Sequence, residues 1–151
     1  MSRKTLLLIV MVLAAVTAGV YTCREFNRKN ESIAKLKPAY QVQALDLIRE
    51  FTENDSSANK KYLGKIVSVK GQIKKIDHDK EGFYTIILGD TAGLSSVLCA
   101  MDTTHNMDAA NLKTISSVSV KGIFIGFEKD ETGLLGSDVK LNRCVIEKQA
   151  H

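Results

Sequence analysis

The stretch from Lys61 to Ile73 constrains the fold more than any other part of this 151-residue chain. It ends a helix-forming segment and enters a strand in which alternate residues from Val67 to Ile73 share one face, while polar side chains occupy the other. Gly71 stands where an inward side chain is expected, which is typical of a strand that bends sharply. The stretch therefore predicts a long, half-buried strand around which a small barrel closes.

The tetrapeptide Ser-Val-Lys-Gly occurs twice, at residues 68–71 and again at residues 119–122. Two copies are too few for a repeat array. We interpret them as two strands that bend at Gly71 and Gly122 and that pair where the barrel closes. Both glycines are therefore predicted to be structural.

The remaining elements follow from periodicity. Apolar residues at helical spacing from Ala44 to Phe51 predict an amphipathic helix, and Asp55 or Ser56 is expected to cap a second, short helix that reaches Tyr62. Further strands are expected at residues 83–88, 95–101, 118–127 and 139–146, with a short helix within residues 103–113. This is the order of an all-β barrel of the OB-fold type, with five strands in a Greek key. The alternative is a five-stranded α+β sandwich.

The N-terminal region is apolar. Arg3 and Lys4 precede an uncharged run from Thr5 to Thr22 that includes Leu6, Leu13 and Val20. As a helix the run would span roughly 25 Å, close to the hydrocarbon core of a membrane. We assign residues 1–23 to a membrane anchor, residues 24–41 to a polar stalk and residues 42–148 to the folded domain. A signal peptide that is cleaved, leaving a secreted domain, is the alternative.

The net charge of +4 is unevenly distributed. Residues 1–37 hold 7 Lys and Arg against 2 Asp and Glu, whereas residues 38–151 hold 14 against 15, so the domain itself is nearly neutral. The basic residues after the apolar run would by count place the domain inside the cell. A short basic segment ahead of an apolar run is typical of an export signal, however. We therefore place the domain on the extracytoplasmic, periplasmic side of a single-pass anchor.

Several short motifs resemble those of the bacterial tRNA-anticodon-like OB-fold proteins. The resemblance covers roughly residues 40–147, and the residues that carry it include Asn54, Ala58, Asn59, Tyr62, Gly64, Lys65, Gly71, Cys99, Gly122, Leu141, Asn142 and Cys144. It implies a small exported or membrane-anchored domain with no established activity. Nucleic-acid binding is implied only by analogy of fold.

Cys99 and Cys144 fall in the third and fifth predicted strands, which lie side by side in an OB-fold. In an exported protein they are expected to form a disulfide. The alternative is a pair of buried thiols that behave as small apolar side chains. No metal site is predicted, because the chain has no Cys-x-x-Cys motif and its three histidines, His78, His105 and His151, are scattered.

Candidate binding residues are few. An OB-fold would bind single-stranded nucleic acid on its second and third strands, where Phe83 and Tyr84 are the only aromatic residues. Together with Lys70 and Lys74 they form the candidate binding face. The third strand has no basic residue, so a nucleic-acid partner is disfavoured.

The sequence shows no P-loop, no nucleophile with a paired base and no cofactor motif. We therefore expect a non-enzymatic binding or assembly module that needs no cofactor and engages a protein or glycan. The alternative function is single-stranded nucleic-acid binding. A hydrolase would need a polar pocket that this sequence does not reveal.

Overall fold

The computed structural model describes residues 11, 16–17, 19–21 and 32–147. The chain divides into two compact units, residues 1–31 and residues 32–151. Leu6 and Leu13, two of the predicted anchor residues, lie outside the described residues, whereas Val20 is described and exposed. Within the part of the chain that is described, no helix combines the length and the apolar character needed to cross a membrane.

The second unit contains six strands, two α-helices and two 3₁₀ helices among its described residues. In chain order these are η1 (Ile33–Lys35), β1 (Tyr40–Gln43), α2 (Ala44–Glu53), α3 (Asp55–Tyr62), β2 (Ile66–His78), β3 (Tyr84–Leu88), β4 (Ser96–Met101), η2 (Asn106–Asn111), β5 (Ser117–Glu128) and β6 (Asp138–Ile146). Five of the strands were predicted, and their bounds differ from the expected ones by only a few residues.

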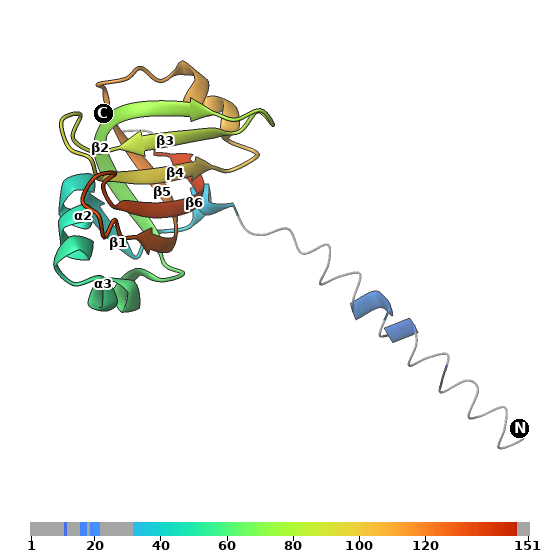
Figure 1. The fold of residues 1–151 in the computed structure, drawn as a ribbon. Helices are drawn as coiled ribbons and strands as arrows, with labels where there is room; N and C mark the ends of the chain where they lie inside the picture. Colours follow the sequence, from blue (N-terminus) through green and yellow to red (C-terminus); the bar gives the residue numbers. More distant parts are fainter. Residues whose placement is uncertain (1–10, 12–15, 18, 22–31, 148–151) are drawn as a thin grey trace, which may run out of the picture. The chain divides into compact units, whose positions relative to one another are not determined.

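Strands β2 to β6 form a closed mixed barrel. Antiparallel pairs join β2 to β3, β3 to β4 and β5 to β6, a parallel pair joins β4 to β6, and β5 returns to β2. This strand order is consistent with the OB-fold, and the closed barrel excludes the α+β sandwich. In Figure 1, α2 and α3 lie together against the barrel, and η2 lies away from them in the connection between β4 and β5.

The two Ser-Val-Lys-Gly segments meet at the closure, as predicted. Val69 of β2 faces Val120 of β5, so that the two tetrapeptides run antiparallel across the pair. Each glycine allows a close approach. A Cβ atom added at Gly71 would lie 2.7 Å from the Ala44 Cβ, and one added at Gly122 would lie 2.4 Å from the Cys144 Sγ. Gly71 therefore lets α2 begin directly over β2, and Gly122 makes room for a buried thiol.

The core consists of buried residues of the barrel strands and continues beneath the helix pair. Ala44, Leu47 and Phe51, the inward residues of α2, are almost fully buried, which confirms the predicted amphipathic helix. The ring of Phe51 stacks on Phe124 and Phe127 of β5, with centroids 5.0 Å apart in both pairs. The prediction for the cap of α3 is wrong: the cap is Asn54, whose side chain accepts a hydrogen bond from the Ser57 amide.

The folded unit begins earlier than the predicted stalk boundary. Tyr40–Gln43 forms β1, which pairs in parallel with residues 67–70 of β2. Ile33 of η1 is buried, and the Lys121 ammonium donates hydrogen bonds to the carbonyls of Ala34 (3.1 Å) and Leu36 (2.8 Å). Residues 32–41, which the sequence assigns to the stalk, are therefore tied to the barrel.

Candidate functional site

The outer surface of β1, β2 and β5 is polar because the strands alternate. Gln43 of β1 lies opposite Lys70 of β2, which in turn lies opposite Ser119 of β5. In the next row Gln72 lies opposite Ser117. Successive side chains of a strand point to opposite faces, so the valines between these residues enter the core. The result is a grid of amide, hydroxyl and ammonium groups over three adjacent strands.

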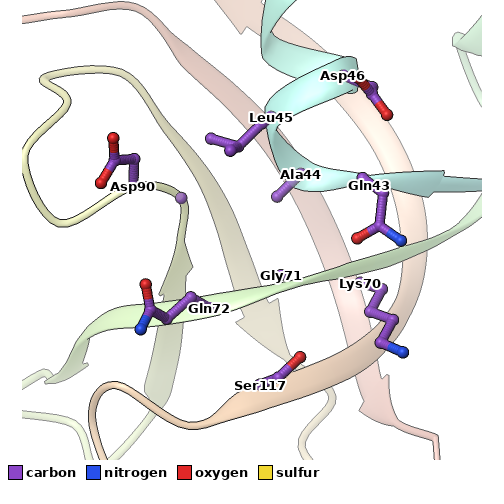
Figure 2. A pocket seen from close by; sticks show the side chains of 10 residues that line it. Gln43, Ala44, Leu45, Asp46, Lys70, Gly71, Gln72, Asp90 and Ser117 are labelled. Carbon is purple, nitrogen blue, oxygen red and sulfur yellow. The ribbon is translucent and has the colours of Figure 1, made fainter.

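This grid forms the floor of two adjoining pockets of about 400 and 480 Å³, which share Gln43, Asp46 and Lys70. We call them together the polar groove. Figure 2 shows the first pocket, with Leu45 and Asp46 of α2 on one side and Lys70, Gln72 and Ser117 on the other. The polar side chains that line the groove are Gln41, Gln43, Asp46, Ser68, Lys70, Gln72, Asp90, Ser117, Ser119 and Glu147.

The charges in the groove are mixed, with acid in excess. Lys70 provides the one ammonium group of the lining, against the carboxylates of Asp46, Asp90 and Glu147. Glu147 accepts a hydrogen bond of 2.5 Å from the Ser68 hydroxyl and lies 3.7 Å from the Lys121 ammonium. Asp46 is paired with Arg49 at 2.7 Å. Asp90 accepts a hydrogen bond from the Ala92 amide (3.1 Å). All three carboxylates are therefore already engaged within the protein.

Other groups in the groove remain available to a ligand. Within residues 32–147, the side chains of Gln41, Gln43 and Lys70 are exposed and form no hydrogen bond with another described residue. The lining contains no aromatic side chain. No group of three or more His, Cys, Asp or Glu residues in the described part of the chain could hold a metal ion. The groove thus offers hydrogen-bonding groups rather than stacking surfaces or metal ligands.

The predicted binding face is divided in the structure. Lys70 lines the polar groove, but the Lys74 ammonium donates hydrogen bonds to the Gly93 carbonyl (2.8 Å) and the Ser96 hydroxyl (2.9 Å), bracing the connection between β3 and β4. Tyr84 packs against His78, with ring centroids 4.5 Å apart, and Phe83 beside it is 38% exposed. The four residues therefore do not form one face: Lys70 lies in the groove, Lys74 supports the connection between β3 and β4, and the two aromatic residues lie apart from both.

The rest of the groove was not predicted from the sequence. The sequence pattern that corresponds to the groove is the alternation of polar residues at positions 41 and 43, 68 to 72, and 117 and 119. Read separately, each set looks like the solvated face of a strand. Only the register of β1 and β5 against β2 shows that the three sets are neighbours.

The predicted disulfide is not present, which corrects the sequence analysis. Cys99 and Cys144 are both free and fully buried. A register shift between β4 and β6 places Cys144 opposite Met101 rather than opposite Cys99. Burial, and then the neighbouring Cys99 thiol, raises the pKa of Cys144 well above its ordinary value. Both side chains therefore fill the core, and Cys144 does so as a neutral thiol.

We expect these two thiols to be unreactive in the native protein, because both are fully buried. In a Cys23→Ser variant of the full chain, a maleimide should label neither cysteine at neutral pH. Both should be labelled after denaturation in guanidinium without any reductant, as counted by intact mass. Labelling that required a reductant would show that a disulfide exists.

A family model described as tRNA_anti-like matches residues 1–137. Among solved structures, the chain is similar to a Klebsiella pneumoniae protein described as a "putative nucleic acid-binding lipoprotein", with 16% identity and a TM-score of 0.55, over 81% of this chain and 100% of that one. It is also similar to asparaginyl-tRNA synthetase from Pyrococcus horikoshii, with 20% identity and a TM-score of 0.38, over 60% of this chain and 21% of the synthetase. No match was found among curated proteins.

Proposed function

Because the chain belongs to the tRNA_anti-like family, we propose that it is a non-catalytic binding module of the cell envelope whose ligand occupies the polar groove. The observation that carries this proposal is the grid of polar side chains over three adjacent strands, beside the start of α2, in which Gln43 and Lys70 are exposed and unengaged. A concave surface with a few convergent polar groups is the usual form of a binding site.

The chemistry of the groove favours a ligand of low net charge. A phosphate chain would meet three carboxylates and one ammonium group, whereas phosphate recognition needs clustered Lys and Arg. Stacked bases would need aromatic faces, which the lining lacks. Amide and hydroxyl groups instead pair well with peptide groups. We therefore propose that the ligand is a polar, weakly charged segment of a partner protein.

The location is part of the same proposal. The apolar run that begins at Thr5 supports an anchor in the membrane, and the start of the folded unit at Ser32 leaves a short polar linker between them. The likeness to a protein described as a lipoprotein agrees with an envelope location. In this arrangement the domain binds its partner close to the membrane, on the extracytoplasmic side.

Selection of a random peptide library on the full chain tests the ligand class. Peptides of low net charge should be enriched, and Gln43→Ala and Lys70→Ala should each weaken their binding by about tenfold, the loss expected at a contact near the centre of an interface. Lys75→Ala is the matched control, because Lys75 lies on the same strand, is exposed and does not line the groove. Equal losses in Lys70→Ala and Lys75→Ala would contradict a site in the groove.

A second candidate function, binding of single-stranded nucleic acid, rests on the aromatic edge of β2 and β3. His78 and Tyr84 pack together there, and Phe83 is partly exposed. In the same binding assay, an oligo(dT) probe should not be retained even at low salt. Retention that falls steeply with salt and is lost in Tyr84→Ala would favour this second function over the first.

A further inference from the structure

Three leucines are exposed where two connections of the barrel meet. Leu94, in the connection between β3 and β4, is 60% exposed. Leu134 and Leu135, in the connection between β5 and β6, are 76% and 82% exposed. Apolar side chains of this size are common singly on a surface, but neighbouring ones mark an interaction site. We call these three residues the leucine patch.

Backbone contacts hold the two connections together. A Cβ atom added at Gly136 would lie 2.4 Å from the Leu94 carbonyl carbon, so the chain segments touch at this point. The Ser137 amide also donates a hydrogen bond to the Ser95 hydroxyl (3.0 Å), and the Ser96 amide donates one to the Ser137 carbonyl (3.1 Å). Leu94 therefore lies beside the segment that carries Leu134 and Leu135.

The segment that carries the leucine pair is internally braced. The Asp130 carboxylate accepts hydrogen bonds from the amides of Thr132 (2.9 Å), Leu135 (2.7 Å) and Gly136 (2.9 Å). The Thr132 hydroxyl also donates a hydrogen bond to this carboxylate (2.6 Å). That bond, followed by those from the amides, holds the pKa of Asp130 well below its usual range. The backbone is thus organised while the two leucine side chains point into solvent. Two apolar side chains on an ordered backbone lose less conformational entropy on binding than the same side chains on a flexible segment.

The charges around the patch indicate the partner. Residues 89–95 and 128–138 together contain five acidic residues, Asp90, Glu128, Asp130, Glu131 and Asp138, and one basic residue, Lys129. Two further lysines reach this region, because Lys74 donates a hydrogen bond to the Gly93 carbonyl and Lys140 pairs with Glu128. The balance of charge stays acidic, with five carboxylates against three ammonium groups. An anionic membrane surface would be repelled by this set. A segment that combines aliphatic and basic side chains would match both the leucines and the carboxylates around them. We propose that the leucine patch docks a basic amphipathic helix of a partner protein.

Hydrogen exchange of residues 129–137, measured on the full chain, tests this proposal. The probe is a synthetic helix of Leu and Lys of about 18 residues, roughly five turns. Exchange of the segment should slow when this peptide is added, and a Leu/Glu peptide of the same length should have no effect. A double variant, Leu134→Ser with Leu135→Ser, should weaken binding of the Leu/Lys peptide by about tenfold. Glu131→Lys should also weaken it.

The matched control is Leu63→Ser, since Leu63 is 61% exposed at the end of α3 and outside the patch. Equal binding of the Leu/Lys peptide by the double variant and by this control would overturn the proposal. Slower exchange on adding anionic vesicles, but not on adding peptide, would make a membrane the occupant and overturn it as well. If exchange slowed only as the protein concentration rose, the patch would bind a second copy of the chain, and the proposal would be overturned.

Discussion

Replacing Phe51 by alanine is expected to lower the free energy of unfolding by about 3–5 kcal/mol, the loss typical of removing a buried aromatic side chain. Phe51 has no exposed surface, and its ring lies 5.0 Å from Phe124, 5.0 Å from Phe127 and 5.9 Å from Tyr62, measured between centroids. The ring thus joins α2 and α3 to β5. Its loss leaves a cavity between the helix pair and the barrel.

Urea unfolding followed by circular dichroism measures this loss. The midpoint should fall while the dependence on urea concentration stays the same, which separates a stability change from a change in the unfolded state. Phe83→Ala is the matched control, because Phe83 is partly exposed and lies just before β3. It should cost about 1 kcal/mol or less. Similar losses in the two variants would mean that Phe51 is not the centre of the core.

Replacing Gly122 by alanine is expected to destabilise the domain by about 1–3 kcal/mol, the usual cost of overpacking a filled core. The added Cβ would lie 2.4 Å from the Cys144 Sγ, 3.2 Å from the Asn142 carbonyl oxygen and 3.4 Å from the Leu141 Cβ. The closest of these atoms belongs to a side chain that can be removed. Cys144→Ala should therefore relieve much of the cost.

A double-mutant cycle separates this steric conflict from other causes. Gly122→Ala with Cys144→Ala should be more stable than the sum of the two single losses by about 1 kcal/mol or more. Gly71→Ala provides the control, because its added Cβ would meet Ala44 rather than a cysteine. The stability lost in Gly71→Ala should add to the stability lost in Cys144→Ala when the two changes are combined. Additive losses at Gly122 as well would show that the thiol does not occupy the space beside it.

The barrel was predictable because its signals are local. The spacing of Leu47 and Phe51 specified α2, and the alternation around Val69 specified β2. The repeated tetrapeptide also indicated which strands pair, because two strands that bend at the same motif can lie side by side where the barrel closes. Membership of the family agrees with this prediction.

The features that were missed depend on register and on short segments. β1 has four residues and follows Pro38, so its alternation was too brief to distinguish from a linker. The relation of Cys99 to Cys144 depends on a register shift in the parallel pair of β4 and β6, which no spacing in the sequence encodes. The polar groove required the register of three strands at once. These features depend on contacts between segments that are distant in the sequence, so local sequence patterns could not predict them.

The hydrogen bonds from the Lys121 ammonium to the carbonyls of Ala34 and Leu36 also have a mechanical meaning. Any tension that arrives through the N-terminal residues acts first on this ammonium and on the buried Ile33 beside it, before it reaches β1. The load passes into β5 across its pairing with β2, where many backbone hydrogen bonds share it. Force applied from the N-terminal side is therefore expected to break the Lys121 hydrogen bonds before it separates β1 from β2.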